Sequence, residues 1–492
     1  MEKKYYYAVG LEIHAELKTQ TKMFCGCKND PDEEAPNVNI CPVCMAHPGA
    51  LPVLNKKAIE NVIKVGLALE GKIADFTEFD RKNYFYPDIP KGYQISQYKY
   101  PIVSGGHLAG FDITRVHLEE DTANNKHYAS GVGHLSEVSN TRSEGYSLID
   151  FNRSGVPLME LVTEPHAFEN TEEAAKIATK FAKEYQLLLW YLGVSEANME
   201  KGEMRVEANV SVSIDKKKLG TKVEVKNLNS FRSVERAILY ELDRMGELLK
   251  SGKANEIVQE TRGWDEGKQK TFSQRKKESS EDYRYFPDPD LPKLKLHEEF
   301  DLKKMKSELP ELPAQKRARY KKDFGIKDED IEVYINDPEL GATFSAIAEI
   351  LTNPEKIKIA SNYLTSDYIG LKKSKTEALL PSAENFAELI NLVTDNKISS
   401  RAAKDILAMI MQNDESPLKI ATEKNLLQSN DENALKKIAQ KVIDTNPKVV
   451  ADYKSGKENA LMSLVGQIMK ETKGSANPAM AKNILINMLA HP

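Results

Sequence analysis

Two closely spaced pairs of cysteines lie near the start of the chain, and they are its only cysteines. Cys25-Gly-Cys27 and Cys41-Pro-Val-Cys44 are separated by thirteen residues. Paired cysteines at this separation can close a tetrahedral Zn–S₄ site, in which four thiolates leave no open position for catalysis. The spacing therefore predicts a structural zinc site, although four free, buried thiols would also be compatible with it.

Residues 9–17 alternate between apolar and polar side chains, a pattern typical of a strand with one buried face. Glu12 and His14 fall on the polar face as near neighbours, so they could bind one cation together. A solvated polar face is the other interpretation, and spacing alone leaves both open.

Two other glutamates break the pattern of the strands that contain them. In residues 114–121 Glu120 takes a position on the apolar face, and in residues 156–162 Glu160 lies within an otherwise apolar run. A buried carboxylate is costly unless it is paired or bound to a metal. Together with Glu12 and His14, these residues predict a site for a hard cation, and Mg²⁺ with its preference for phosphates fits it best. A salt bridge to an arginine is the alternative.

Cationic and amide side chains follow in the next predicted strands. Arg205 begins the polar face of residues 205–214, Lys226 and Asn227 end the strand expected at 221–227, and Asn229 comes just after it. Such groups beside carboxylates could clamp phosphates. An ordinary two-faced sheet explains the same pattern equally well.

Two segments interleave cations with aromatic residues. Arg81 and Lys82 lie in residues 80–87, and Arg284 lies in residues 282–287. Such interleaving can stack on and neutralise a nucleotide or an RNA end. Packing of the loops around proline is the alternative interpretation.

The periodicity predicts an α+β fold for the first part of the chain. Strands are expected at residues 9–17, 113–121, 156–162, 205–214 and 221–227, and long helices at 171–192 and 231–249. A proline-rich segment, 287–313, is interpreted as a boundary, and the sequence after it is helical by period. We expect three domains: residues 1–298, a helical domain at 299–415, and a helical tail at 416–492.

Composition restricts the location and partners of the protein. The chain has 492 residues and a net charge of −5, which argues mildly against nucleic acid held by bulk electrostatics. Residues 416–492, however, contain 11 Lys and 7 acidic residues and carry +4, so an RNA could be bound locally. The sequence has no signal-peptide pattern and no apolar run long enough for a membrane span. With so few cysteines, we expect a cytoplasmic protein without a membrane partner.

The sequence resembles the family of B subunits of glutamyl-tRNA(Gln)/aspartyl-tRNA(Asn) amidotransferases. The blocks that carry the resemblance are VGLEIHAEL (9–17), NICPVCMAHPGALPVLNKKA (39–58), FDRKNYFYPDIPKGYQISQY (79–98), HLEED (117–121), DFNRSGVPLMELVTEP (150–165), VEVKNLNSFRSVE (223–235), QETRGWDE (259–266) and EDYRYFPDPDLP (281–292). GKENALMSLVGQIMKETKGSANP (456–478) is similar to the helical tail shared with YqeY-like proteins. After HLEED the family commonly continues Ala-Gly-Lys, where this chain has Thr122-Ala-Asn-Asn-Lys126.

The resemblance implies an activity and a set of partners. Such a protein works in a heterotrimer that also contains an amidase, the A subunit, together with a small C subunit. It uses ATP and Mg²⁺ to phosphorylate the side-chain carboxylate of Glu or Asp on a mischarged tRNA, and ammonia from the amidase then displaces phosphate. The implied fold is an antiparallel sheet with helices, related to glutamine synthetase, followed by a helical domain and the tRNA-binding tail. A non-catalytic, tRNA-binding scaffold protein is the alternative.

The resemblance also assigns roles to residues. The implied Mg²⁺ ligands are Glu12, His14, Glu120 and Glu160, and the four cysteines match the zinc-bearing members of the family. Arg205 and Lys226 are expected to neutralise charge during catalysis. The residues expected to bind substrate are Arg81, Lys82, Asn227, Asn229 and Arg284.

Overall fold

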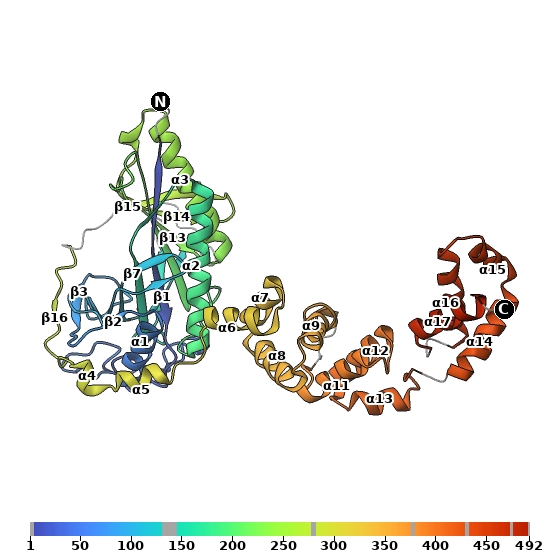
Figure 1. Ribbon diagram of the computed structural model, residues 1–492. Coiled ribbons are helices and arrows are strands. Elements are labelled where there is room, and N and C mark those ends of the chain that lie inside the picture. The colour runs from blue at the N-terminus through green and yellow to red at the C-terminus, as the bar shows by residue number, and fades with distance from the viewer. Residues whose placement is uncertain are drawn as a thin grey trace. The chain divides into compact units, whose positions relative to one another are not determined.

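The computed structural model describes residues 4–129, 145–276, 282–374, 379–428, 432–472 and 476–490. The chain forms two compact units, residues 1–313 and 314–492 (Figure 1). In the described segments no helix is both long and apolar enough to span a membrane.

The first unit is built on an eleven-stranded sheet, which confirms the predicted α+β class. Its strands follow the order β15-β14-β13-β12-β1-β10-β7-β5-β2, with β11 beside β1 and β6 beside β7. Their bounds are β1 (Tyr6–Glu16), β2 (Lys72–Ile73), β5 (Val103–Ser104), β6 (His107–Leu108), β7 (Phe111–Glu120), β10 (Pro157–Thr163), β11 (His166–Phe168), β12 (Met204–Ser213), β13 (Val223–Leu228), β14 (Glu260–Asp265) and β15 (Lys270–Lys276). The pairs are antiparallel, as the family resemblance implied, except that β13 and β14 run parallel.

Two smaller sheets complete the strands of this unit. One has the order β16-β3-β4 and the other pairs β8 with β9. Their bounds are β3 (Asp80–Asn83), β4 (Tyr93–Ser96), β8 (Asn124–Ala129), β9 (Gly145–Asp150) and β16 (Phe286–Pro287). β4 packs against β7, so the small sheet adjoins the centre of the large one.

Three helices cover the apolar face of the large sheet: α1 (Lys56–Ala68), α2 (Thr171–Leu192) and α3 (Phe231–Lys250). α2 has the predicted bounds because both ends are capped. The side chain of Asn170 accepts from the Glu173 N–H, and Gly193 ends the helix in the left-handed conformation at φ 65°. In Figure 1 α2 and α3 lie along one side of β1.

The core of the first unit fixes which face of each central strand is free. Alternate residues of β1, such as Val9, Leu11 and Ile13, are at most 1% exposed and pack toward the helices. Val206 and Val210 of β12 do the same. Because side chains alternate across a strand, the intervening polar residues face the other side of the sheet.

The first unit continues past the expected boundary at residue 298. It includes α4 (Leu296–Glu299) and α5 (Leu302–Ser307), and Leu296 is fully buried in its core. Phe300, Leu302 and Met305 pack against the same core. The proline-rich segment therefore belongs to the first unit, and the division falls at Pro313.

The second unit is helical, as predicted. Its elements are α6 (Pro313–Arg319), α7 (Asp328–Asn336), α8 (Pro338–Leu351), α9 (Pro354–Asn362), α10 (Ile369–Ser374), α11 (Ala383–Thr394), α12 (Ser400–Asn413), α13 (Pro417–Glu423), α14 (Glu432–Thr445), α15 (Pro447–Lys454), α16 (Asn459–Glu471) and α17 (Pro478–Ala490), with π-helical turns at Tyr320–Phe324 and Tyr363–Tyr368.

The tail has its own core, formed by apolar residues of α14, α16 and α17 from Leu435 to Leu489. α13 instead packs against α11 and α12, and the Ser416 hydroxyl donates to Glu388 of α11 at 2.8 Å. The expected boundary at residue 416 thus lies too early, because α13 belongs to the preceding helices.

Candidate active site

The polar face of the large sheet brings together ionisable side chains from neighbouring strands. Antiparallel pairing places His14 of β1 opposite Glu160 of β10, and Glu160 opposite His117 of β7. On the other side of β1, Glu12 lies opposite Glu207 of β12. Residues paired across a sheet share one face, so these side chains form a row across it.

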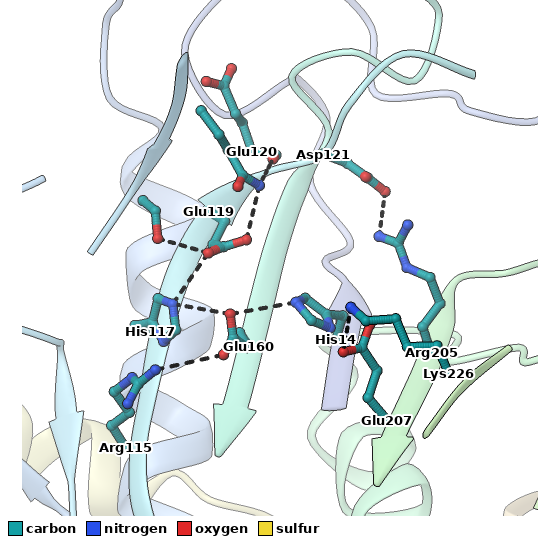
Figure 2. Close-up of polar contacts among 12 residues, drawn as sticks. His14, Arg115, His117, Glu119, Glu120, Asp121, Glu160, Arg205, Glu207 and Lys226 are labelled. Carbon is teal, nitrogen blue, oxygen red and sulfur yellow. Dashed lines mark hydrogen bonds and ion pairs between the residues drawn. The ribbon is translucent and has the colours of Figure 1, made fainter. Parts of the chain in front are cut away.

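Glu160 is at the centre of this row (Figure 2). Its Oε2 lies 3.4 Å from His14 Nε2 and 3.3 Å from His117 Nε2, and its Oε1 lies 3.8 Å from Arg115 Nη2. Glu160 and His117 are buried. One carboxylate is therefore held between two imidazoles.

Three groups of ligand atoms along the row are close enough to hold a metal ion. They are Glu12, His14 and Glu160; His117, Glu119 and Glu160; and Glu12, Glu207 and Glu224, and the atoms within each group lie within 4.8 Å of one another. Glu160 belongs to two groups and Glu12 to two. Carboxylate oxygens dominate, which is the donor set that Mg²⁺ prefers.

Burial and mutual charge shift the pKa values of the central groups. Burial raises the pKa of Glu12 to about 7, and the charges of Glu160 and Glu207 add to this effect. Burial opposes a charge on His14, but the hydrogen bond and charge of Glu160 raise its pKa to about 9. Burial likewise opposes a charge on Glu160, yet the two histidines hold its pKa well below the usual value. At neutral pH His14 therefore carries a proton and balances the charge of Glu160.

Glu119 is held in the row by the small sheet. Gln94 Nε2 donates to its Oε2 at 2.9 Å, and Ser96 Oγ donates to its Oε1 at 2.7 Å. Burial opposes a charge on Glu119, but the charge of Lys82 lowers its pKa. Lys82 is thus one predicted substrate-binding residue that lies electrostatically next to the row.

Glu120 does not join the predicted ligands. It points to the opposite face of β7 from Glu119, as Figure 2 shows. Its Oε1 accepts from the Ile95 N–H at 2.8 Å and lies 2.5 Å from Lys91 Nζ. The alternative interpretation, an ion pair with a cation, describes Glu120, although the partner is a lysine and not an arginine.

Arg205 and Lys226 lie on the same face of the large sheet as the row, and each forms an ion pair with a carboxylate. Arg205 Nη2 lies 2.7 Å from Asp121 Oδ2, and Lys226 Nζ lies 2.8 Å from Glu207 Oε2. Both cations therefore flank the row on the β12 and β13 side (Figure 2).

The other predicted substrate-binding residues lie outside the row. Arg81 is tied to Asp288 at 2.7 Å and Asp290 at 2.8 Å, and so it joins β3 to the segment after β16. Exposed side chains are found at Asn227, Asn229 and Arg284.

Four members of these ligand groups were not predicted as site residues from the sequence: His117, Glu119, Glu207 and Glu224. A signal was present, because His117 and Glu119 fall on the predicted polar face of residues 114–121 and Glu207 on that of residues 205–214. Only the strand order, however, shows that these faces adjoin Glu160 and Glu12.

The four cysteines converge as their spacing predicts. Their sulfur atoms all lie within 4.8 Å of one another, and the Cys41 N–H donates to Cys44 Sγ at 3.1 Å. Behind them, the fully buried Lys22 donates to the carbonyls of Asn39 at 2.8 Å and Phe151 at 3.0 Å. Four converging thiols fit a structural zinc ion.

Metal analysis of the purified protein should give about one zinc per chain, because four sulfur ligands at this distance bind zinc tightly. Thiol titration should find the cysteines unreactive until zinc is chelated. A folded, metal-free protein with four reactive thiols would contradict the assignment.

Comparison with known proteins gives two family matches. Residues 7–301 match the model described as the GatB/GatE catalytic domain, and residues 343–489 match the one described as the GatB domain. The chain is 41% identical to the B subunit of the aspartyl/glutamyl-tRNA(Asn/Gln) amidotransferase of Thermotoga maritima, covering 99% of both chains. It is 40% identical to the protein of that name in Gloeothece citriformis, covering 98% of this chain and 97% of the relative. The chain belongs to the B-subunit family of these amidotransferases.

The ionisable row lies entirely within the part of the chain that matches the catalytic domain of this family. That match ends at residue 301, close to the end of the first unit. The second match begins at residue 343, and so it includes helices that the sequence reasoning placed in a separate domain before residue 416.

Proposed function

We propose that the chain is the ATP-using member of a cytoplasmic, tRNA-dependent amidotransferase complex. It binds Glu-tRNA(Gln), Asp-tRNA(Asn) or both, phosphorylates the side-chain carboxylate with ATP, and works with the amidase A subunit plus the small C subunit. Ammonia from the amidase then gives Gln-tRNA(Gln) or Asn-tRNA(Asn). Full-length similarity to amidotransferase B subunits, together with the ionisable row, supports this proposal.

The residues present fit divalent cations. The three ligand groups overlap through Glu12 and Glu160, so they would hold neighbouring ions on one face. Among the described residues, the buried Asn209 Oδ1 on the same strand as Glu207 accepts no hydrogen bond. An acceptor without a donor beside three glutamates favours a cation. Mg²⁺ bound here would neutralise phosphate oxygens and orient them for transfer.

The chemistry explains why ATP is required. A carboxylate resists amination because its leaving group would be oxide. An oxygen of the substrate carboxylate attacks the γ-phosphorus, and ADP leaves. Ammonia then attacks the acyl carbon, gives up a proton, and phosphate leaves with that carboxylate oxygen. Phosphoryl transfer depends mainly on positioning and charge neutralisation, so it needs cations rather than a nucleophilic side chain.

The chain's own cations surround the row. Lys82 faces Glu119, Arg115 lies beside Glu160, and Lys226 lies beside Glu207. Each cation now faces a carboxylate of the row. When a metal ion binds that carboxylate, the cation is free to turn toward a phosphate. We assign Lys82, Lys226 and Arg205 to substrate charge, and Arg81 to holding β3 in place.

The experiment that tests this function uses the complex with the A and C subunits. ATP hydrolysis should depend on a mischarged tRNA and not occur with the uncharged form. A non-catalytic scaffold would bind both tRNAs without hydrolysis and would need no row of metal ligands.

Mg²⁺ affinity should rise with pH. At pH 6 Glu12 and His14 hold protons, because their pKa values are about 7 and about 9. A bound cation must displace both protons, so between pH 6 and pH 8 the affinity should increase about 10-fold from Glu12 and about 100-fold from His14, or about 10³-fold together. Titration calorimetry with Mg²⁺ alone measures this.

The same two pKa shifts predict how stability depends on pH in the absence of the metal. The pKa of Glu12 is raised above its ordinary value of 4.5, and that of His14 above its ordinary value of 6.5. Between about pH 4.5 and 9 the folded state therefore binds more protons than the unfolded state. In EDTA, stability should therefore fall as pH rises through this range. A pH-independent Mg²⁺ affinity would contradict the assignment of these two ligands.

A further inference from the structure

Three segments around the small sheet bring together an aromatic array, defined here as Tyr84, Tyr98, Tyr283 and Tyr285. Tyr84 follows β3, Tyr98 follows β4, and Tyr283 and Tyr285 precede β16. They meet because Phe286 pairs with Arg81, and Asn83 pairs with Tyr93. Segments about 200 positions apart in sequence thus lie side by side, as the pairing of β16 with β3 shows (Figure 1).

The rings of the array are ordered but remain accessible. Tyr98 and Tyr285 stack with centroids 4.3 Å apart and an angle of 11° between their planes. Tyr283 meets Tyr84 and Tyr285 edge-on, at 6.1 Å in each case. Yet Tyr98 remains 49% exposed. Exposed, pre-arranged rings of this kind are what a single-stranded nucleic acid needs for stacking of its bases.

Cations are interleaved with the rings. Lys82 Nζ lies 5.1 Å from the centre of the Tyr283 ring. Arg284 is exposed between Tyr283 and Tyr285. A surface of stacked rings and positive charge complements bases and phosphates better than it complements an apolar protein surface.

The array also adjoins the ionisable row. Burial opposes a charge on Lys82, but the charges of Glu119, Tyr285 and Glu160 hold its pKa well above the usual value. From the next strand, Gln94 and Ser96 bind Glu119 directly. Anything stacked on the array would therefore have its end next to the proposed phosphorylation site.

We propose that the aromatic array stacks the unpaired 3′ end of the aminoacyl-tRNA and so delivers the aminoacyl group to the row. The inference rests on the proposed function for the identity of the RNA. The array extends over three segments, which is more than one adenine of ATP would cover. Several successive bases of a single strand match it better.

The test compares a tRNA(Gln) that keeps its full 3′ end with the same tRNA trimmed of its unpaired 3′ nucleotides. Filter binding to the full-length protein gives Kd for both. We expect Tyr98→Ala and Tyr285→Ala each to raise Kd for the full tRNA about tenfold, because each variant removes a ring on which a base would stack. Kd for the trimmed tRNA should not change.

Matched variants separate stacking from general damage. Tyr98→Phe keeps the ring and should bind like the wild type. Phe272→Ala removes a ring that is 43% exposed on β15, at the far edge of the large sheet, and should also bind like the wild type.

The inference is overturned if the alanine variants raise Kd equally for the full and the trimmed tRNA, or if they change Kd for neither. It is also overturned if they weaken ATP binding, which would assign the rings to the nucleotide. Loss of association with the A and C subunits at unchanged RNA affinity would identify a protein interface instead. If the complex fails to amidate mischarged tRNA while the 3′-end dependence holds, the proposed function fails and the stacking surface stands.

Discussion

Replacing Glu160 with glutamine is expected to lower tRNA-dependent ATP hydrolysis on the order of 10³-fold. Glutamine keeps the shape of the side chain and removes its charge. Glu160 belongs to two of the three ligand groups and lies between two histidines and Arg115. Without the carboxylate charge, those groups of atoms lose their shared ligand, and the surrounding cations lose their partner.

Glu120→Gln is the matched control for this variant. Glu120 is adjacent in sequence to Glu119 but pairs with Lys91 on the opposite face of β7. Mg²⁺ affinity, measured calorimetrically, should therefore fall sharply in Glu160→Gln and remain near the wild-type value in Glu120→Gln. Retained activity in Glu160→Gln, or the reverse order of the two variants, would show that the metal assignment is wrong.

Deletion of residues 432–492 is expected to raise Kd for tRNA at least about tenfold and to leave Mg²⁺-ATP binding unchanged. This segment contains 9 Lys and 5 acidic residues, so it carries a net +4. Contacts between lysines and phosphates make affinity depend on salt, and their loss should lower that dependence. Binding measured at several salt concentrations provides both quantities.

The deletion begins after α13 for a structural reason. α13 packs against α11 and α12, whereas the tail has a separate core. Cutting at residue 416 would expose apolar residues of the preceding helices and confuse misfolding with lost RNA contacts. Equal losses of tRNA and Mg²⁺-ATP binding in the 432–492 deletion would count against a role of the tail in binding RNA.

Local patterns in the sequence predict the elements better than they predict the site. α2 has its predicted bounds because its caps are local, and the faces of β1 and β12 follow from alternation. The same alternation placed Glu120 on the apolar face, which is correct. Its assignment as a ligand came from that break in the pattern and from the family resemblance, and neither shows toward which residues the side chain points.

Contacts between distant segments could not be predicted from the sequence. The neighbours of Glu160 depend on β10 lying between β1 and β7. Arg81 donates a hydrogen bond to Asp288, which lies 207 residues further along the chain and holds the guanidinium in place. Neither strand order nor such a pairing has a signature in local periodicity, and so His117 and Glu119 were missed and Arg81 was assigned to substrate.

The path of the carboxylate oxygen tests the central claim most directly. Glu-tRNA(Gln) and Asp-tRNA(Asn) labelled with ¹⁸O in the side-chain carboxylate would be supplied with ATP and glutamine to the complex with the A and C subunits. Mass spectrometry of the released phosphate then follows the label. If the carboxylate is phosphorylated, each phosphate released during amidation of Glu-tRNA(Gln) or Asp-tRNA(Asn), whichever the complex accepts, should contain one ¹⁸O. Phosphate without ¹⁸O, released while amide forms, would contradict the account.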